Sequence, residues 1–352
     1  RERSPMPLNR PSLAVSPPAL PELTAPTLEK EESFDLSETG TFSKGAFTMG
    51  REGLEGRSNF TLDDLEVQKT LGSGASSTVR LVTDRVSGQN LALKELNVMC
   101  DQDTMHMTIN EIKILHKAHS DHLVSFIDAF FDNGRIYLAL EFCDAGSLDD
   151  VIKLTPADAR PRIPEPVMAE VVSQSLEGLA YLHQEQKQVH RDLKPANIML
   201  TRKGEVKLGD FGISKQLDNT LALAVTQCGT TAYMSPERIK GDNYAYDADI
   251  WSLGLIILEM CSGEYPYPAA RNFMQMVMRI CEGPVPTVQA DIVSVPLEEF
   301  VRSCLAKVPS ERPGASKLMV HEWLISRSSS PDTLAEFLEA QARAKESPPL
   351  QE

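Results

Sequence analysis

The chain is short of positive charge and of long apolar runs. Its 352 residues include 35 lysine and arginine residues against 50 aspartate and glutamate residues, so the formal net charge is −15. Such an acidic balance disfavours nonspecific binding to nucleic acid or to acidic membranes, and it suits a partner with a basic surface. No apolar run reaches the roughly 18–20 residues that a transmembrane helix needs, so we expect no membrane span.

Paired cysteines and metal-ligand clusters are also lacking. The six cysteines are scattered, with no C-x-x-C motif and no histidine at metal-ligand spacing. This pattern is typical of reduced thiols inside the cell, so we expect a cytoplasmic location, with the nucleus as a second compartment. The chain begins at Arg1 rather than methionine, which leaves open whether a targeting segment precedes it.

A change of composition near residue 60 divides the chain. Residues 1–58 are rich in proline, serine, glutamate and glycine without sustained periodicity, which predicts a disordered N-terminal tail. Beyond it, short apolar segments separated by turn residues predict strands at 65–67, 79–82, 91–94, 124–131 and 136–141. The run 104–117, between the third and fourth strands, has apolar residues near helical spacing. The sequence therefore predicts a small, mostly antiparallel sheet with one helix.

The second half of the chain has helical character from Ser147 onward. After a long helix that starts just past Pro166, apolar patterns predict further helices at 250–261, 297–305 and 316–324. A final amphipathic segment begins near Ser330, and it either docks on the domain or stays loose. We thus expect an α+β fold of two lobes over 59–325, followed by a helical or flexible extension over 326–352.

Three polar residues flank a short alternating run in the middle of the chain. Asp192 and Asn197 precede the run 198–208, and Asp210 follows it. A strand that turns back, with polar residues at both ends, can aim all three side chains at one point. A carboxylate that accepts a hydroxyl proton, beside a carboxylate and an amide that hold Mg²⁺, is what phosphoryl transfer from ATP requires.

The spacing of these residues resembles that of protein kinases. The motif H-R-D-L-K-x-x-N occupies 190–197 and is followed by D-F-G. The resemblance implies a bilobal protein kinase fold, with a small five-stranded sheet lobe plus one helix and a larger, mainly helical lobe. It implies that Asp192 accepts the proton of the substrate hydroxyl and that Lys194 balances charge on the transferring phosphoryl group. It also implies that Asn197 and Asp210 bind Mg²⁺.

A glycine-rich stretch, residues 71–79, lies between the first two predicted strands. Glycines let backbone N–H groups approach phosphates, although an isolated G-x-G is equally typical of a tight turn. The kinase pattern G-x-G-x-x-G-x-V has Ser77 here at its third glycine. Lys94 follows about twenty residues later, and the resemblance implies that it binds the α- and β-phosphates while Glu111 holds it. Without the resemblance, Glu111 would be a solvated helix carboxylate.

The resemblance also implies an adenine pocket between the lobes. Leu140 would guard its back, and Glu141 and Cys143 would offer backbone groups to adenine. Asp149 or Asp150 would reach the ribose. The full set of implied nucleotide contacts is Leu71, Gly72, Ser73, Gly74, Ala75, Ser76, Ser77, Val79, Ala92, Lys94, Leu140, Glu141, Cys143 and Met199. The apolar members of this set are equally consistent with plain core positions.

Other positions implied by the resemblance are structural. A hydrophobic column that links the two lobes would consist of Leu115, Phe126, His190 and Phe211. His190 is therefore expected to be structural rather than a base. Glu237 is expected to pair with Arg312 in the larger lobe. Asp249 is expected to tie down the segment that carries the catalytic motif.

Two threonines lie in the expected activation segment, which runs from Asp210 to Glu237. Thr220 and Thr226 are separated by five residues, and phosphate on either would add charge and oxygens that arginine can bind. Arg191 is the expected receiver. Threonines in a loop are otherwise ordinary surface residues, so their regulatory role rests on the resemblance.

Further motifs resemble MAP kinase kinases. They are G-S-L-D at 146–149, S-P-E-R at 235–238, D-I-W-S-L-G at 249–254 and G-E-Y-P-Y at 263–267. The resemblance covers about 60–325 and implies dual-specificity phosphorylation of Thr and Tyr in the T-x-Y loop of a MAP kinase. An upstream MAP kinase kinase kinase would activate the protein at Thr220 and Thr226, whose spacing is similar to that of the plant and protist branch.

Two rival interpretations are open at this point. The first is another Ser/Thr kinase of the MAP kinase cascade, acting upstream of the MAP kinase kinase step. The second is a nucleotide-binding pseudokinase scaffold, which predicts losses among Lys94, Asp192 and Asp210, although all three are present.

The N-terminal tail has two matches to a docking motif. In MAP kinase kinases this motif consists of basic residues, a spacer and two apolar residues one apart, and such matches arise easily by chance in a long tail. The candidates for docking a MAP kinase substrate are Arg1 and Arg3 with Met6 and Leu8, or Arg10 with Leu13 and Val15.

Overall fold

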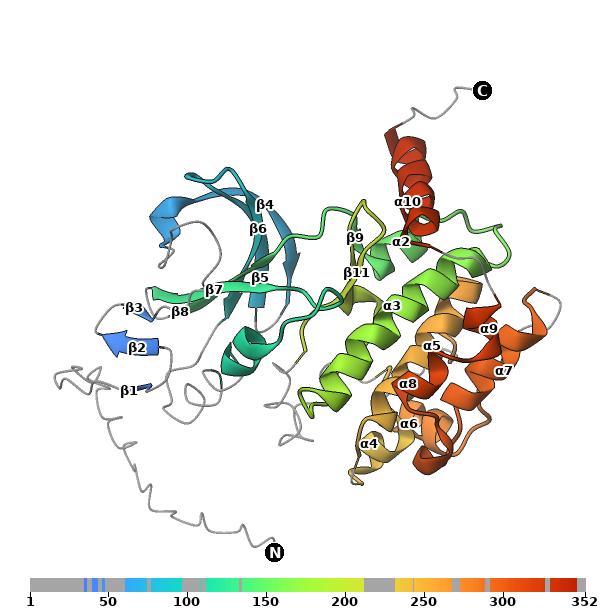
Figure 1. Ribbon diagram of the computed structural model, residues 1–352. Coiled ribbons are helices and arrows are strands. Elements are labelled where there is room, and N and C mark those ends of the chain that lie inside the picture. The colour runs from blue at the N-terminus through green and yellow to red at the C-terminus, as the bar shows by residue number, and fades with distance from the viewer. Residues whose placement is uncertain are drawn as a thin grey trace, which may run out of the picture.

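The computed structural model describes residues 61–74, 77–96, 108, 112–132, 135–211, 232–242, 244–267, 273–288, 292–326 and 330–346, together with short strands at 35–36, 40–43 and 46–47. These residues form two lobes, one built on a β-sheet and the other mainly of helices (Figure 1). The predicted α+β fold of two lobes is confirmed. Across the described ranges, every helix is too short or too polar to span a bilayer.

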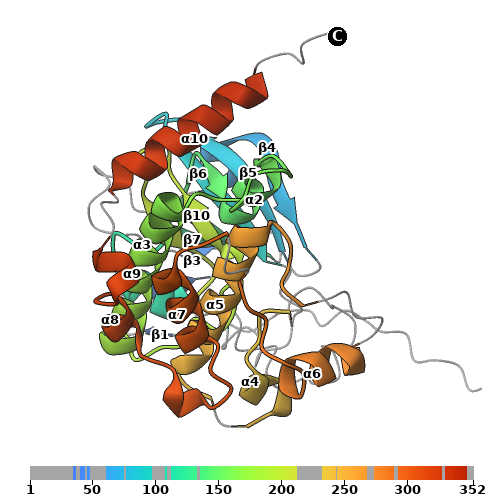
Figure 2. The ribbon, with the colours of Figure 1, turned by 90° about the vertical axis from the view of Figure 1, so that its right-hand side faces the viewer.

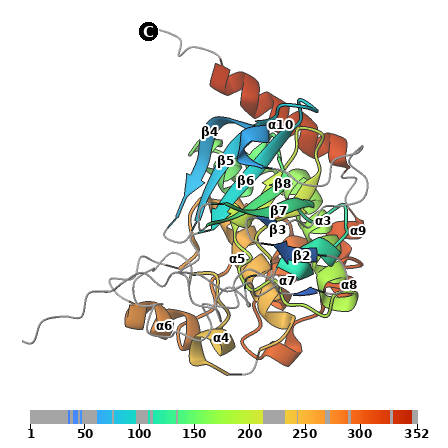
Figure 3. The same ribbon diagram turned by 90° about the vertical axis from the view of Figure 1, so that its left-hand side faces the viewer.

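The smaller lobe is a five-stranded antiparallel sheet in the order β4-β5-β6-β8-β7 (Figure 3). The bounds are β4 Leu65–Ser73, β5 Ser77–Asp84, β6 Asn90–Leu96, β7 Phe126–Asp132 and β8 Arg135–Glu141. Successive side chains of a strand point to opposite faces. Leu91 and Leu93 of β6 are buried in a small core on one face. Ala92 and Lys94 therefore lie on the other face.

The helix predicted over 104–117 precedes β7. Its described residues, Thr108 and 112–117, are helical, and Ile112 and Leu115 are buried in the main core. The loop that follows forms a parallel bridge between Leu123 and Leu208, which belongs to the larger lobe. The end of this helix is therefore attached to both lobes.

Two long helices organise the larger lobe. α3 (Glu165–Gln184) begins after Pro164 and has Pro166 in its first turn, where a missing N–H costs no helical hydrogen bond. α5 (Asp247–Ser262) ends at Gly263, whose φ of 79° suits a left-handed C-terminal cap. Both helices lie where the sequence predicted them.

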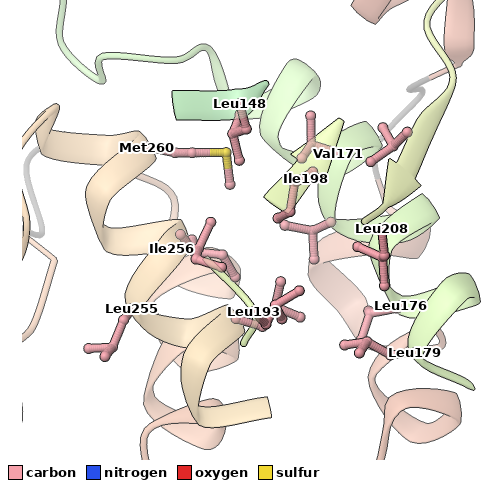
Figure 4. Close-up of a cluster of buried hydrophobic side chains, with 14 of the residues drawn as sticks. Leu148, Val171, Leu176, Leu179, Leu193, Ile198, Leu208, Leu255, Ile256 and Met260 are labelled. Carbon is pink, nitrogen blue, oxygen red and sulfur yellow. The ribbon is translucent and has the colours of Figure 1, made fainter. Parts of the chain in front are cut away.

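The core between these helices holds the segment that carries the catalytic motif. Buried side chains that meet there include Leu176, Leu179, Leu193, Ile198, Ile256 and Met260 (Figure 4). The predicted run 198–208 is a hairpin of β10 (Ile198–Leu200) and β11 (Val206–Leu208), to which β9 (Gly146–Ser147) adds a third strand. Because Ile198 pairs with Leu208, the residues before β10 and after β11 meet at one end of the hairpin.

The larger lobe also holds shorter helices among its described residues. They are α2 (Leu148–Leu154), α4 (Pro236–Lys240), α6 (Phe273–Cys281), α7 (Val295–Cys304), α8 (Ala315–Leu318) and α9 (Glu322–Ile325). The single helix predicted at 316–324 is wrong, because α8 and α9 are separate. The side chain of His321 accepts a hydrogen bond from the backbone N of Trp323, so it caps α9 and interrupts the helical run.

Three short strands lie within the segment that the sequence predicted to be disordered. β1 (Asp35–Leu36), β2 (Gly40–Ser43) and β3 (Ala46–Phe47) pair in antiparallel fashion. Threonine and phenylalanine favour strands, and Thr41, Phe42 and Phe47 supply them here. The structure differs from the expectation at these strands, and the rest of 1–58 lies outside the described residues.

The C-terminal helix α10 (Pro331–Glu346) docks on the larger lobe rather than staying loose. It packs across α3 and α2 (Figure 2), with Leu334 and Leu338 buried in the main core. Nε2 of Gln341 donates a hydrogen bond of 2.6 Å to Oγ1 of Thr155 on α2's C-terminal cap. The packed part of the chain therefore extends past the boundary predicted at 325.

Candidate active site

The carboxylate of Asp192 is oriented by two neighbours on the same loop. Nζ of Lys194 donates a hydrogen bond of 2.7 Å to Oδ2 of Asp192, and Nδ2 of Asn197 donates one of 3.0 Å to the same oxygen. Asn197 also donates to the backbone carbonyl of Asp192 at 2.7 Å. The three predicted side chains of this motif thus form one connected group. The second oxygen of Asp192, Oδ1, makes none of these hydrogen bonds.

Helix α5 fixes this loop through a buried aspartate. Asp249 accepts hydrogen bonds from the backbone N of His190 at 2.8 Å and of Arg191 at 3.0 Å. Nε2 of His183 on α3 lies 2.8 Å from the same carboxylate. Burial acts to raise the pKa of Asp249, but these hydrogen bonds outweigh burial and hold the pKa below its ordinary value. The loop is therefore attached to both long helices, and Asp249 contacts it as expected.

Asp210 lies at the end of β11, beside the same loop. The backbone N of Gly209 donates a hydrogen bond of 2.8 Å to the carbonyl of Asn197. Asp210 has a φ of 56° and Arg191 a φ of 74°, both in the left-handed region that costs a non-glycine residue energy. Such backbone strain is found most often at functional sites, where surrounding contacts maintain it.

Lys94 extends from the smaller lobe to Asp210. Its Nζ donates a hydrogen bond of 2.6 Å to Oδ1 of Asp210, and its side chain is buried. Loss of solvent acts to raise the pKa of Asp210, but the charge and hydrogen bond of Lys94 outweigh this and lower the pKa. The charge of Lys194 lowers it further. The charges of Lys94, from the smaller lobe, and of Lys194, from the loop that carries Asp192, therefore both act on Asp210 between the lobes.

Asn197 and Asp210 have the chemistry to hold a divalent metal. Because Nδ2 of Asn197 donates to Asp192, its amide oxygen remains as an acceptor. Asp210 is kept ionised by Lys94. Mg²⁺ prefers oxygen ligands and commonly takes only one or two from the protein. Among the described residues there is no cluster of three or more metal-ligating carboxylates, histidines or cysteines.

The glycine-rich stretch forms the turn between β4 and β5. The backbone N of Gly74 donates a hydrogen bond of 2.8 Å to the carbonyl of Ser77, and the hydroxyls of Ser73 and Thr78 lie 3.5 Å apart. A Cβ built on Gly72 would meet nothing within 4 Å. The space beside Gly72, at the end of β4, is therefore open. Ala75 and Ser76 lie outside the described residues.

The predicted adenine-pocket residues come from both lobes. Ala92 pairs with Leu140 across β6 and β8, on the face of β6 that also carries Lys94. Met199 lies on β10 of the larger lobe, half-buried. Val79 in β5 and Leu71 in β4 complete the smaller-lobe side, and Leu71 is largely exposed. These positions are compatible with a base held between the lobes.

The segment that joins the lobes follows β8. The backbone N of Glu141 already donates to the carbonyl of Ser125 at 2.9 Å, so Glu141 could offer only its carbonyl to a base. Burial raises the pKa of the Cys143 thiol to about 12, and the neighbouring Glu141 carboxylate adds to the rise. The thiol therefore stays protonated near neutral pH, and Cys143 can contribute backbone groups but not a thiolate nucleophile.

The predicted hydrophobic column connects the lobes. Its members Leu115, Phe126, His190 and Phe211 are all buried. The ring centroids of His190 and Phe211 lie 6.4 Å apart. Burial lowers the pKa of His190, so its ring is neutral near pH 7. This supports the prediction that His190 is structural.

A buried ion pair lies at the C-terminal end of the expected activation segment, at Glu237. Arg312 donates from Nη1 and Nη2 to the two carboxylate oxygens of Glu237, at 2.7 and 2.9 Å. The guanidinium also lies 5.1 Å from the ring centroid of Trp251 on α5. The pair predicted from the sequence is confirmed, and it attaches α4 to the core of the larger lobe.

Two groups near the catalytic loop were not predicted. Arg238 donates a hydrogen bond to the carbonyl of Arg191, and both guanidiniums lie over the ring of Tyr244, at 5.1 and 5.9 Å from its centroid. His183 was also missed. The sequence signals for these residues, an arginine after Glu237 and a histidine at the end of a helix, are common in any protein and do not indicate their partners.

Several predicted site residues lie outside the described residues. They are Glu111, Thr220, Thr226 and the tail residues Arg1, Arg3, Met6, Leu8, Arg10, Leu13 and Val15. Their expected roles stay predictions.

The protein kinase domain family matches residues 65–324 of the chain. The chain is 34% identical over 338 residues to mitogen-activated protein kinase kinase 1 of Arabidopsis thaliana, covering 90% of this chain and 93% of that protein. It is 36% identical over 336 residues to mitogen-activated protein kinase kinase 3 of the same plant, covering 89% of this chain but 64% of the relative's length. A dual specificity mitogen-activated protein kinase kinase 1 of Dictyostelium discoideum is 43% identical over 237 residues, 67% of this chain and 35% of that protein. The chain therefore belongs to the protein kinase family and, within it, to the MAP kinase kinases.

Proposed function

We propose that this protein transfers the γ-phosphoryl group of ATP to a threonine and a tyrosine in the T-x-Y loop of a MAP kinase. The observation that carries the proposal is the connected group of Lys94, Asp210 and the Asp192 loop between the lobes. The relatives' names support the substrate class, and the name of the Dictyostelium relative supports dual specificity.

The proton acceptor for the substrate hydroxyl is Asp192. Its Oδ2 is occupied by Lys194 and Asn197, which leaves Oδ1 to receive a hydroxyl. The Lys194 ammonium, held beside Asp192, is placed to offset charge on the transferring phosphoryl group. Phosphoryl transfer needs little covalent chemistry from the protein, so positioning and electrostatic stabilisation supply most of the catalysis.

The nucleotide is held from both lobes. Lys94 exchanges its contact with Asp210 for the α- and β-phosphates, and Glu111 holds it there. Asn197 and Asp210 would hold Mg²⁺, which when bound would neutralise charge on the phosphates. The glycine-rich turn covers the phosphates with backbone N–H groups. Leu71, Val79, Ala92 and Met199 enclose the base in front of Leu140, while Glu141 and Cys143 bind its edge through backbone groups.

An upstream MAP kinase kinase kinase switches the protein on by phosphorylating Thr220 and Thr226. Arg191 receives the phosphate, because its guanidinium lies beside the catalytic loop and shares the Tyr244 ring with Arg238. A MAP kinase docks on the N-terminal tail through one of the two basic and apolar matches. The protein acts in the cytoplasm and the nucleus.

Mass spectrometry of a catalytically dead MAP kinase tests this proposal. After incubation with this protein, an upstream kinase and ATP, we expect phosphate on both the Thr and the Tyr of the T-x-Y loop. A reaction without this protein controls for the upstream kinase. Phosphate on neither residue, with transfer to other cascade kinases instead, would favour the rival of a Ser/Thr kinase acting further upstream. ATP binding without transfer to any acceptor would favour the pseudokinase scaffold.

A further inference from the structure

A buried lysine outside the catalytic group joins the two ends of the nucleotide site. Lys207 lies on β11, three residues before Asp210, and 7% of the residue is exposed. Its Nζ lies 3.1 Å from Oε1 of Glu141. Glu141 directly follows Leu140, the residue expected at the back of the adenine pocket. A lysine is rarely buried to this degree unless it is paired. Glu141 therefore offsets the cost of burying the Lys207 ammonium, and the mechanism proposed above gives this pair no role.

The same two side chains also hold the loop before β7. Nζ of Lys207 donates a hydrogen bond of 3.0 Å to the backbone carbonyl of Asp121. The second carboxylate oxygen of Glu141 accepts a hydrogen bond of 3.1 Å from the backbone N of Ser125. The ion pair is thus hydrogen-bonded at both ends and bridges the lobe connection, the loop 118–125 and β11.

The loop 118–125 is also attached to the larger lobe. The backbone N of Val124 donates to the carbonyl of Leu208 at 3.0 Å, and the N of Leu208 donates to the carbonyl of His122 at 2.9 Å. Nε2 of His122 lies 2.8 Å from the carboxylate of Glu177 on α3. α3 approaches so closely that a Cβ on Gly178 would lie 2.8 Å from the His122 carbonyl. The larger lobe therefore anchors one side of the bridge.

We propose that Lys207 is a positioning residue that fixes the Glu141 peptide against β11, and so sets the distance between the adenine end and the metal end of the nucleotide site. The Glu141 carbonyl faces the base under the function proposed above, and β11 carries Asp210. A shift at either end moves adenine relative to the phosphate and metal ligands. A nucleotide whose two ends no longer fit the site together loses contacts in the ground state and the transition state alike, so its affinity falls.

A purely stabilising ion pair would behave differently. Its loss would lower the fraction of folded protein, which reduces kcat per total protein while the Michaelis constant for ATP stays unchanged. A positioning role instead raises the Michaelis and dissociation constants for ATP, with kcat at saturating ATP preserved. The split between these constants separates the two roles.

The test uses the full chain with Lys207→Met, Glu141→Gln and the double variant, which removes both charges and leaves no charge buried alone. We expect each single variant to raise the dissociation constant for ATP by about fivefold or more, and kcat to stay within about twofold. Because the two residues act as one unit, the double variant should match a single variant within about twofold. Lys203→Met, an exposed lysine in the turn of the same hairpin, is the matched control and should bind ATP like the wild type.

Unchanged ATP affinity in the double variant would overturn the proposal, as would single effects that multiply in the double variant. Fluorescence titration with a nucleotide analogue measures the affinity without any protein substrate. If the wild type binds ATP but does not modify a MAP kinase, the proposed function fails while this test still stands. If Lys207→Met does not fold, Glu141→Gln and the double variant decide.

Discussion

Nζ of Lys94 lies 2.6 Å from Oδ1 of Asp210, although 116 positions separate the two residues in the chain. The contact joins β6 of the smaller lobe to the end of β11 in the larger lobe. It exists because alternation along β6 buries Leu91 and Leu93 on one face and turns Lys94 to the other. Phosphates that enter between the lobes would replace Asp210 as the partner of this ammonium.

Replacing Lys94 with methionine tests that role. The variant keeps the apolar stem but removes the charge that would bind the phosphates, so kcat/KM for ATP should fall by about 100-fold or more. Lys69→Met, in which an exposed lysine of the same sheet is changed, is the control and should retain activity. Steady-state kinetics at varied ATP measures both. Equal kcat/KM in Lys94→Met and the wild type would contradict the assignment.

The role of Asp192 predicts a loss of transfer without a loss of binding. In Asp192→Asn the side chain can no longer accept a proton, so transfer should fall by about 100- to 10,000-fold. The dissociation constant for ATP should stay within about twofold, because Asp192 contacts Lys194 and Asn197 and no proposed nucleotide contact depends on its charge. Transfer to a MAP kinase and a nucleotide titration measure the two quantities. Asp158→Asn, an exposed aspartate, is the control.

The Glu237–Arg312 pair predicts a stability that depends on pH. Burial acts to raise the pKa of Glu237, but the hydrogen bonds from Arg312 outweigh it and hold the pKa below 4.5. Because the folded pKa is depressed, the pair's contribution is complete above about pH 4.5 and is lost as the pH falls through the folded pKa.

Arg312→Met leaves the buried Glu237 without its partner, so the free energy of unfolding at neutral pH should fall by about 3–5 kcal/mol. The difference from the wild type should shrink in urea titrations performed below pH 4.5. Arg343→Met removes the arginine of an exposed pair with Glu339 and should cost about 1 kcal/mol or less. A difference that grows toward acidic pH would be the wrong sign.

The close approach of Gly204 to the start of α10 allows the packing of this helix to be tested. Gly204 has a φ of 79°, and a Cβ there would lie 1.9 Å from the carbonyl oxygen of Pro331 at the start of α10. Gly88 has a similar φ of 72°, but a Cβ there would meet nothing within 4 Å. Both alanine variants therefore share the backbone cost, and only Gly204→Ala displaces the helix.

We expect the free energy of unfolding to fall by about 1–3 kcal/mol more in Gly204→Ala than in Gly88→Ala. Hydrogen exchange of the α10 amides should also speed up in Gly204→Ala alone, since the helix must move away from the turn. Urea denaturation and exchange mass spectrometry measure these changes. Equal losses in the two variants would mean that α10 is not held against the turn.

The proposed switch predicts a conditional effect at Thr226. Without the upstream kinase, Thr226→Ala and the wild type should have the same low activity. After treatment with the upstream kinase, the wild type should gain activity while Thr226→Ala gains much less, because the phosphate that Arg191 would bind is missing. Radiolabel transfer to a catalytically dead MAP kinase measures both states. Equal activation of the two proteins would exclude Thr226 from the switch.

Much of the site was predictable because its signals are local in sequence. The short apolar run 91–94 predicted the strand that carries Lys94, and the run 198–208 predicted a strand that turns back and brings Asn197 and Asp210 together. Fixed motif spacing then identified the residues. The five strands of the smaller lobe follow from short apolar segments and from the turn residues between them.

Partners far apart in the chain were harder to predict. The contacts of Asp249 with His183 and of Lys207 with Glu141 join residues 66 apart in both cases, measured as 249 minus 183 and 207 minus 141. No pattern in the neighbouring sequence indicates that Lys207 or His183 is buried. The break between α8 and α9 was also missed, because apolar periodicity continues across His321 while its side chain caps the second helix.

The most direct test of the account is the intact mass of a catalytically dead MAP kinase after incubation with ATP and this protein in its activated form. We predict a gain of two phosphates, which a phosphopeptide map should assign to the Thr and the Tyr of the T-x-Y loop, and no gain when Asp192→Asn replaces the wild type. An unchanged mass with the wild type, or an equal gain with Asp192→Asn, would contradict it.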